Sequence, residues 1–226
     1  MKTILTSACF LDGLDKDGRG TRVARNIKYI NYYSKLKEQL GFDKIWLIDN
    51  ASSGENIKAL RDGIGDNYKN VQLFRCEKRL KSSGHVLDYP YCWRALWTIN
   101  EMLINSYVQK VIHIDSDGFV LSQRLMDHLR NTKTGWETFW VERYGFPEAS
   151  LWTLNRDSFS ILNNFFAHGW ASYNGKLMEV ELPFTKVNKE FVTDRFGEDR
   201  TMPNESIDYY GQCPVDIPMK FYEGIK

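Results

Sequence analysis

The sequence predicts a single α/β domain with a mainly parallel sheet flanked by helices. Short apolar runs alternate along the chain with stretches in which apolar residues recur at three- and four-residue spacing, which is the pattern of strands alternating with helices. The 226 residues are enough for one sizeable core, and no change in composition divides them. We therefore expect one domain over residues 1–226.

The first elements follow a strand, helix, strand, helix order. Residues 4–10 are typical of a strand, and a Gly- and Asp-rich loop over 12–20 follows. From Thr21 the apolar residues have helical spacing, and Gly41 is placed as a helix C-cap. Residues 44–48 predict the second strand, and a helix over 54–62 comes after its polar turn.

The alternation continues through the middle of the chain. Residues 71–74 predict a third strand, and a long helix over 89–105 has an apolar face from which Arg94 points away. Residues 123–131 and 156–167 predict further helices, with a strand over 137–142 between them. Beyond Gly169 the pattern weakens into short strands, loops and prolines.

A fourth predicted strand, residues 111–114, ends on two carboxylates, Asp115 and Asp117. Ligands collect at the carboxyl ends of strands in an open α/β sheet, and paired carboxylates suit a hard divalent cation that bridges to a phosphate. A lone Asp-x-Asp is often only a capped surface turn. Here the apolar run before it and Gly118 after it favour metal binding.

Right-handed crossovers place the ends of the first, second and fourth strands at one edge of the sheet. The turn after the second strand contains Asp49, which suits ribose hydroxyls or a base edge, and also Asn50 and Ser52, either of which suits a helix N-cap. Both roles are open for this turn. The guanidinium of Arg94 suits phosphate oxygens or a sugar hydroxyl, but a surface position on an amphipathic helix is an equal alternative.

Together these features resemble the GT-A fold glycosyltransferases, the nucleotide-sugar-dependent class with a DxD motif. The resemblance covers roughly residues 3–125 and rests on the strand ends at 6–8 and 48–52, the helix with Arg94, and residues 113–117. It implies that Asp115 and Asp117 hold Mn²⁺ or Mg²⁺ on the donor diphosphate. It also implies donor contacts from a set of nucleotide-sugar-binding residues: Thr6, Ser7, Ala8, Asp49, Asn50, Ser52, Arg94 and Ser116.

The second half of the chain departs from the subfamilies of this class. It lacks the late His-x-x-Gly-x-Lys-Pro-Trp block of many retaining members, and His168 is the nearest substitute for a third metal ligand, or else simply ends a helix. Glu198 and Asp199 resemble the late Glu-Asp pair of inverting members, in which one carboxylate is the general base. Glu148 is a further candidate catalytic carboxylate, in an acceptor-side segment that also contains Phe146. Trp152, close by in sequence, suits sugar stacking or the core equally.

The resemblance implies a nucleotide-sugar-binding half over about residues 1–122 and an acceptor-binding half over about 123–226. The expected activity is transfer of one hexosyl or pentosyl unit from a nucleoside diphosphate sugar, with UDP favoured, to a hydroxyl acceptor such as a glycan. One alternative is a haloacid-dehalogenase-like phosphatase with Asp115 as nucleophile, although that class carries the motif on its first strand. Another is a non-catalytic sugar-nucleotide-binding module.

Composition restricts the partners and the compartment. The formal charge of +1 gives no global field toward nucleic acid or membranes. Two basic stretches keep modified DNA as a less favoured acceptor: Arg75, Lys78, Arg79 and Lys81, with Arg19, Arg22, Arg25 and Lys28. No apolar run approaches about 18 residues, so we expect no membrane span. Four cysteines without CxxC spacing predict reduced thiols and a cytoplasmic protein, while the oligomeric state is not determined by the sequence.

Overall fold

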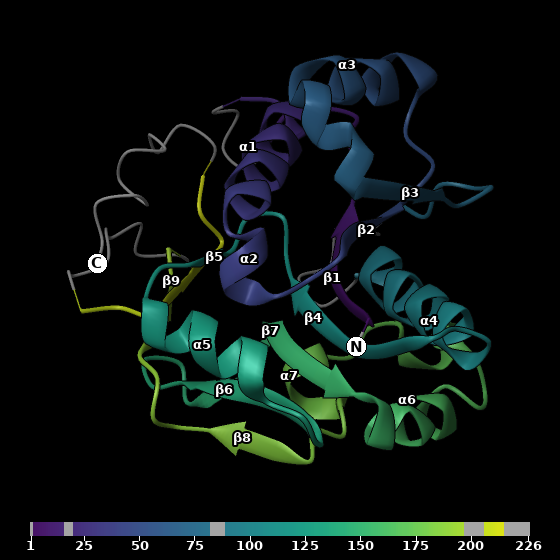
Figure 1. Ribbon diagram of the computed structural model, residues 1–226. Coiled ribbons are helices and arrows are strands. Elements are labelled where there is room, and N and C mark those ends of the chain that lie inside the picture. The colour runs from purple at the N-terminus through teal and green to yellow at the C-terminus, as the bar shows by residue number, and fades with distance from the viewer. Residues whose placement is uncertain (1, 16–19, 82–88, 197–205, 215–226) are drawn as a thin grey trace.

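A seven-stranded sheet forms the centre of the molecule in the computed structural model, which describes residues 2–15, 20–81, 89–196 and 206–214 (Figure 1). From one edge to the other the sheet contains β3 (Val71–Arg75), β2 (Lys44–Asp49), β1 (Lys2–Cys9), β4 (Val108–Ile114), β7 (Phe146–Asn155), β6 (Trp136–Val141) and β8 (Lys186–Asn188). The first four of these strands are mutually parallel. This confirms the predicted fold class.

The strand registers bring three polar turns to one edge of the sheet. Cys9 of β1 pairs with Asp49 of β2, and Thr6 of β1 pairs with His113 of β4. The carboxyl ends of β1, β2 and β4 therefore lie side by side, as the right-handed crossovers predicted.

Strand β7 is absent from the sequence prediction. It runs antiparallel to both β4 and β6, and its last eight residues are all buried. A strand that is covered on both faces has no alternation of polar and apolar residues to reveal it. Trp152 lies in this strand and is fully buried, so of the two roles considered for it, sugar stacking and a core position, the structure shows the core position.

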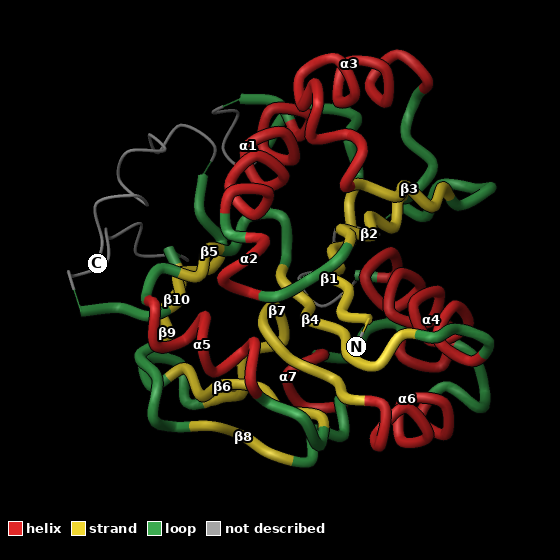
Figure 2. Tube along the Cα trace, viewed as in Figure 1, coloured by secondary structure: helices red, strands yellow, loops and turns green. Residues whose placement is uncertain are grey.

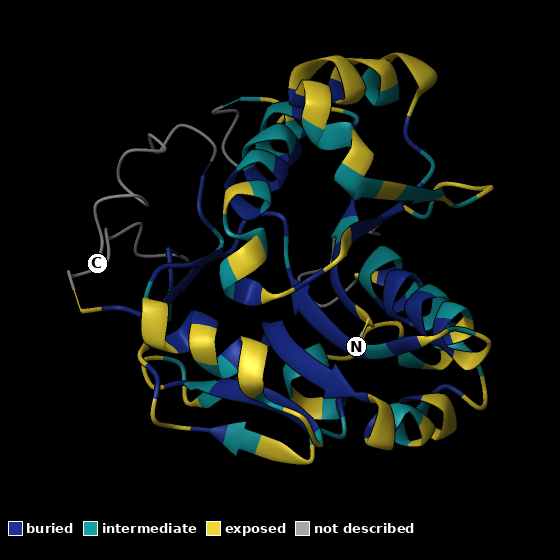
Figure 3. Cartoon of the chain, in the orientation of Figure 1, coloured by how far each residue is buried: buried dark blue, intermediate teal, exposed yellow. Residues whose placement is uncertain are grey.

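Helices cover both faces of the sheet (Figures 1 and 2). One face packs against α1 (Arg22–Lys35), α2 (Lys37–Leu40), α3 (Gly54–Ile64) and α5 (Gln123–Asn131). The other packs against α4 (Pro90–Ile104), α6 (Phe159–Phe165) and the 3₁₀ helix η4 (Trp170–Tyr173). Along β2 the side chains alternate, since Leu47 joins the first core and Trp46 the second. Figure 3 shows the central strands β4 and β7 buried, the edge strands β3 and β8 partly exposed, and the outer helix surfaces exposed.

Several predicted helix ends are shifted in the structure. The helix from Thr21 breaks at Leu36 into α1 and α2, and Gly41 ends α2 with φ +68°, which confirms the predicted C-cap. The N-cap of α3 is Ser53, whose hydroxyl oxygen accepts from the Asn56 N–H at 3.3 Å. The predicted caps, Asn50 and Ser52, were therefore wrong. The helix predicted over 156–167 divides into the 3₁₀ helix η3 (Arg156–Ser158) and α6.

A second, three-stranded sheet brings the late part of the chain beside β4. It contains β5 (Phe119–Val120), β10 (Tyr209–Gly211) and β9 (Thr193–Arg195) in that order. It packs on α1, where the ring of Tyr32 meets that of Phe119 edge-on at 5.1 Å. The short elements η2 (Gly65–Asn70) and α7 (Met178–Glu181) complete the described chain.

The structure bears on two expectations from the sequence, one about membrane spans and one about the state of the cysteines. Over the described ranges, no helix combines the length and the apolar character needed to cross a bilayer. All four cysteines are free thiols; Cys9 and Cys213 are buried, and Cys76 and Cys92 are partly buried.

A buried carboxylate, Glu137 on β6, links this strand to helix α5 and to the edge strand β8. His128 Nε2 lies 3.1 Å from Glu137 Oε2, and Lys186 Nζ lies 2.9 Å from Glu137 Oε1. Asn188 Nδ2 also donates to Oε1 at 2.9 Å. Burial by itself would raise the pKa of Glu137, but the hydrogen bonds from these three side chains lower it to about 2.

We predict that Glu137 makes the fold acid-sensitive. Because its pKa is lower in the folded than in the unfolded chain, its stabilisation is complete above about pH 4.5 and is lost as the pH falls toward about 2. Urea unfolding should show that Glu137→Gln loses roughly 2–3 kcal/mol less than the wild type across this window. Glu142→Gln, which changes an exposed carboxyl just after β6, is the matched control and should retain the wild-type dependence. An unchanged acid sensitivity in Glu137→Gln would refute this assignment.

Candidate active site

The two carboxylates that follow β4 lie on a tight turn, residues 115–118, which we call the diacid turn. The N–H of Gly118 donates to the carbonyl of Asp115 at 2.9 Å and closes the turn. The Asp115 N–H donates to the Ser150 carbonyl of β7 at 3.0 Å, and the Cys213 N–H donates to the Asp117 carbonyl at 2.8 Å. The diacid turn is thus held by backbone hydrogen bonds to two segments of the second half of the chain, β7 and the residues that follow β10.

Gly118 is required in this turn by a close approach. A β-carbon at this position would lie 2.1 Å from the hydroxyl oxygen of Tyr209, so any other residue would require this fully buried ring to shift. That hydroxyl also lies 2.8 Å from Ser150 Oγ, which fixes the tyrosine against β7. On the other side of the turn, the Tyr33 hydroxyl of α1 donates to the Gly118 carbonyl at 2.9 Å.

Asp115 is the more open of the two acids, with 38% of its side chain exposed. His113 Nε2 lies 3.1 Å from Asp115 Oδ1, and His113 Nδ1 lies 3.1 Å from Thr6 Oγ1. The imidazole also stacks on Trp152, with the ring centroids 4.6 Å apart. A chain of contacts from β1 through β4 therefore orients one oxygen of Asp115 and leaves the other side of the carboxylate accessible.

Asp117 is more enclosed, with 12% of its side chain exposed. Arg25 of α1 reaches it with Nη1 at 3.7 Å from Oδ2, and the same nitrogen lies 2.8 Å from Asp15 Oδ1. Burial by itself lowers the pKa of Arg25, but the negative charges of Asp117 and Asp15 outweigh this and raise the pKa above its ordinary value. Arg25 is therefore a fixed positive charge beside the diacid turn.

The diacid turn fits a hard divalent cation that takes most of its ligands from elsewhere. In the described part of the chain, no three His, Cys, Asp or Glu side chains form a cluster able to hold a metal ion. His168 is exposed in the turn after α6, outside any such cluster. Asp115 and Asp117 supply two carboxylates, which suits Mg²⁺ or Mn²⁺ when phosphate oxygens and water complete an octahedral shell.

Asp49, at the end of β2, is fully buried and shapes its own turn. Its Oδ2 accepts from the Ser52 N–H at 2.9 Å, its Oδ1 accepts from the Ser52 hydroxyl, and Arg75 Nε lies 4.0 Å from Oδ2. Burial raises the pKa of Asp49, although Ser52 and Arg75 act in the opposite direction. Within this turn Ala51 adopts a left-handed conformation with φ +58°. These contacts favour the structural reading of Asp49 over direct contact with a nucleoside.

Arg94 and Asn50 tie three segments together. The side-chain amide of Asn50 bonds both backbone groups of Leu80, at 2.8 and 3.0 Å. Arg94 donates from Nη1 to the Lys78 carbonyl at 2.6 Å and from Nη2 to Asn50 Oδ1. Arg94 thus holds the segment after β3 against the turn after β2, a role that neither of the two sequence readings anticipated.

The two basic stretches of the sequence meet at Phe10. The guanidinium of Arg79 lies 4.1 Å from the centroid of the Phe10 ring, and that of Arg22 lies 5.1 Å from it. Arg75 donates to the Ser52 carbonyl at 2.6 Å and keeps about half of its side chain exposed. Positive charge therefore gathers at the ends of β1 and β3. Arg19 lies outside the described residues.

Three of the four remaining predicted donor contacts lie in less accessible positions than the sequence suggested. Thr6 and Ser7 are buried inside β1, and Ser116 is buried within the diacid turn. Ala8, by contrast, is partly exposed near the end of β1. Of the predicted β1 residues, Ala8 is the one with surface at the edge of the sheet.

Glu148, the predicted acceptor-side carboxylate, is held in a buried ion pair. Arg195 of β9 donates from Nε to Glu148 Oε2 at 2.8 Å and from Nη2 to Oε1 at 2.6 Å. Ser150 donates to the same Oε1 from its N–H and its hydroxyl, at 2.9 and 2.6 Å. Both oxygens are therefore occupied, which favours a structural role. The other two predicted catalytic residues, Glu198 and Asp199, lie outside the described residues.

Arg195 also connects Glu148 to a less buried acid. Its Nη2 lies 3.0 Å from Oε1 of Glu179, on α7. Burial by itself lowers the pKa of Arg195, but Glu148 and Glu179 together raise it above its ordinary value. Arg195, Glu179 and Asp15 were not identified from the sequence, and Arg25 was named there only as a member of a basic stretch, because pairings between distant residues leave no local pattern.

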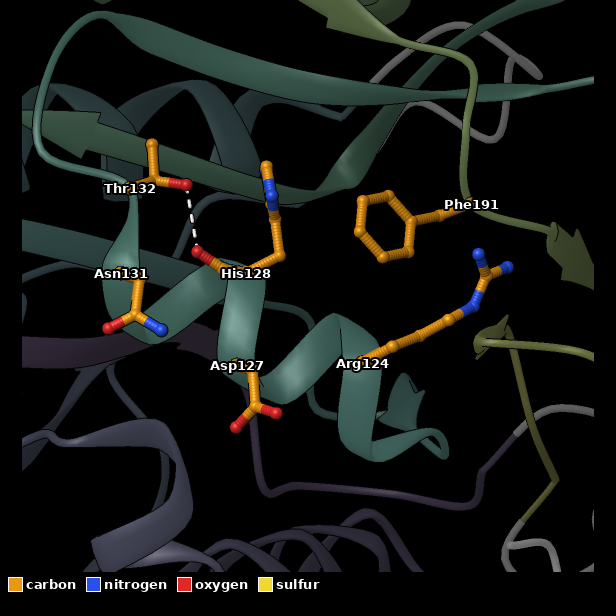
Figure 4. A pocket seen from close by; sticks show the side chains of 6 residues that line it. All are labelled: Arg124, Asp127, His128, Asn131, Thr132 and Phe191. Atoms are coloured by element: carbon orange, nitrogen blue, oxygen red, sulfur yellow. Dashed lines mark hydrogen bonds between the residues drawn. The ribbon is translucent and has the colours of Figure 1, made fainter.

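A separate hollow of about 470 Å³ lies over α5, away from the diacid turn. It is lined by Arg124, Asp127, His128, Asn131, Thr132 and Phe191 (Figure 4). Arg124 is committed to the buried Asp208, with its Nε 2.7 Å from Asp208 Oδ1, and His128 is committed to Glu137. Because Arg124 and His128 are both paired with buried acids that support the fold, we assign this hollow no catalytic role.

Comparisons with known proteins bear on the fold. No protein-family model and no curated protein sequence matches the chain. Among solved structures, the chain resembles a glycosyltransferase involved in the glycosylation of the major capsid of PBCV-1, with a TM-score of 0.51 and 9% identity over 100% of both chains. It also resembles the galactosyltransferase LgtC in complex with donor and acceptor sugar analogues, with a TM-score of 0.55 and 10% identity over 100% of this chain and 95% of that one.

A third similar structure is the apo form of the bifunctional glycosyltransferase WbbM. Its TM-score is 0.53 at 11% identity, and the match covers 95% of this chain and 46% of that one. At such identities the likeness concerns the fold. The chain thus has the α/β fold of GT-A-type glycosyltransferases, as the sequence predicted.

We predict that Glu148 stabilises the fold through Arg195. Glu148→Gln removes the principal partner of a buried guanidinium and should lower the free energy of unfolding by about 3–5 kcal/mol. Glu179→Gln, which leaves Arg195 its bond to Glu148, is the matched control and should cost about 1 kcal/mol. Urea unfolding of both variants measures the difference. Equal, small losses would mean that Glu148 is not the structural partner described above.

Proposed function

We propose that the chain is a metal-dependent glycosyltransferase that moves one hexosyl or pentosyl unit from a nucleoside diphosphate sugar, UDP-sugar favoured, to an acceptor hydroxyl. The observation that carries the proposal is the diacid turn, with an accessible Asp115 and an enclosed Asp117, at the carboxyl end of a central strand. The likeness of the fold to glycosyltransferase structures supports it.

In this proposal the donor lies along the carboxyl ends of β1, β2 and β4. Asp115 and Asp117 hold Mn²⁺ or Mg²⁺ against the diphosphate, and the bound ion supplies neutralisation of the leaving diphosphate. His113 keeps Asp115 oriented toward that position, and the arginines around Phe10 attract the anionic donor.

The acceptor hydroxyl must lose a proton as it attacks the sugar carbon. In an inverting enzyme a carboxylate takes that proton, and Glu198 or Asp199 remain our proposed bases. A glycan is the favoured acceptor. The arginines at Phe10 keep modified DNA as the alternative, which duplex-DNA binding that weakens steeply with salt would support.

The phosphatase alternative has less support. In that class the nucleophile follows the first strand, whereas Asp115 follows the fourth strand of this chain. Asp115 also accepts from His113, which holds it as an oriented ligand. Failure of beryllium fluoride, a phosphate mimic, to form a stable complex at Asp115 would agree with the transferase.

The direct test is turnover of a panel of UDP- and GDP-sugars with Mn²⁺ present. Release of the nucleoside diphosphate that requires the metal supports the transferase. Binding of a donor without hydrolysis or transfer would support the non-catalytic binding module, and absence of both binding and release would overturn the proposal.

We predict that Asp117→Asn abolishes most of this metal-dependent release. Replacing one of two anionic ligands weakens the hold on the cation and its contribution to the leaving diphosphate, so the rate should fall by at least about 100-fold. Asp127→Asn, an exposed carboxylate of α5, is the matched control and should keep the wild-type rate. Unchanged release in Asp117→Asn would exclude the diacid turn as the metal site.

We further predict that His113 positions Asp115 for the cation. His113→Phe keeps a ring that can stack on Trp152 but removes both imidazole nitrogens. Calorimetry should show binding of Mn²⁺ with UDP weakened by about 10- to 100-fold, the range for loss of a group that orients a metal ligand. Thr6→Val, one contact further away, should have a smaller effect. Wild-type affinity in His113→Phe, with an unchanged thermal transition, would contradict this role.

A further inference from the structure

Arg25 contacts Asp117, so a cation bound at the diacid turn would lie close to its guanidinium. We propose that Arg25, balanced by Asp15, makes this site select a divalent cation that already carries an anionic diphosphate over the bare cation. This inference rests on the proposed function and adds to it a specificity-determining residue outside the diacid turn.

The geometry fixes Arg25 beside Asp117. It is on the first turn of α1, with its N–H donating to the Thr21 carbonyl at 3.1 Å and 15% of its side chain exposed. Its Nη1 lies 2.8 Å from Asp15 Oδ1 and 3.7 Å from Asp117 Oδ2. Its Nε is buried and has no hydrogen-bond partner within the described chain. One donor of this guanidinium is therefore unsatisfied next to the diacid turn.

Electrostatics gives Arg25 opposite effects on two ligands. A divalent cation on Asp117 lies within a few ångströms of the guanidinium, and even at the dielectric constant of bulk water, about 80, this repulsion over about 6 Å weakens binding by about tenfold. A nucleoside diphosphate brings negative charge, which attracts both the metal ion and the guanidinium of Arg25. The same residue thus disfavours the bare cation and favours the complex.

Asp15 acts in the opposite sense. Its side chain is almost completely buried, and its contact with Arg25 is shorter than that of Asp117. It therefore offsets part of the positive charge that a cation at the diacid turn would meet. Removing Arg25 and removing Asp15 should change the affinity for a bare cation in opposite directions, whereas damage to the fold would weaken binding in both variants.

The experiment measures binding rather than turnover. Full-length wild type, Arg25→Gln, Arg25→Lys and Asp15→Asn are titrated with Mn²⁺ alone, and then with UDP at saturating Mn²⁺, by electron paramagnetic resonance of free Mn²⁺ and by calorimetry. Lys58→Gln is the charge control, because Lys58 is exposed on α3 and pairs with Asp62. Circular dichroism and thermal melting monitor the fold of each variant.

We expect Arg25→Gln to bind Mn²⁺ alone about tenfold more tightly than the wild type and UDP with Mn²⁺ about tenfold more weakly. Asp15→Asn should bind Mn²⁺ alone more weakly, Arg25→Lys should resemble the wild type, and Lys58→Gln should match it.

Two failures are distinguishable. If the wild type binds UDP with Mn²⁺ but Arg25→Gln and Asp15→Asn change the Mn²⁺ affinity in the same direction or not at all, the role of Arg25 is overturned and the proposed function stands. If the wild type binds no UDP-, GDP- or sugar-nucleotide ligand with Mn²⁺, the proposed function fails, and this inference fails with it.

Discussion

The need to neutralise buried carboxylates governs the carboxyl edge of the sheet. Asp49, Asp117 and Glu148 are buried there, and isolated buried charges would destabilise the fold by several kcal/mol each. Each has an arginine from a different part of the chain: Arg75 at the end of β3, Arg25 on α1 and Arg195 on β9. These pairings help to dock α1, β3 and the small sheet on the edge where the diacid turn lies.

The elements that could be predicted from the sequence are those that do not depend on such pairings between distant residues. Features with a local pattern were predicted well, including β1, β2, β4, the bounds of α5 and the common edge of three strand ends. Strand β7 was missed because it is buried on both faces, and Ser53 was missed as a cap because Asn50 and Ser52 beside it are equally good candidates by residue type.

The residues of the candidate site also divide into those with a local sequence pattern and those whose contacts are distant in sequence. Asp115 and Asp117 were predicted from their place after an apolar run, and that place is confirmed. The partners of Asp49, Arg94 and Glu148 could not be predicted, because each contact joins residues that are distant in sequence or depends on a turn such as that at Ala51. Two acids with suitable residue types, Asp49 and Glu148, therefore proved to be engaged inside the protein.

The contacts of Tyr209 and Cys213 with the diacid turn also bear on how the protein is made. Residues 115–118 leave the ribosome long before Tyr209 packs on Gly118 and before the Cys213 N–H reaches the Asp117 carbonyl. Because domains fold as synthesis proceeds and distant contacts form late, the central strands can assemble while this turn still lacks its final supports. The diacid turn therefore matures last, so a truncated chain that kept every strand of the main sheet would still lack the final supports of this turn.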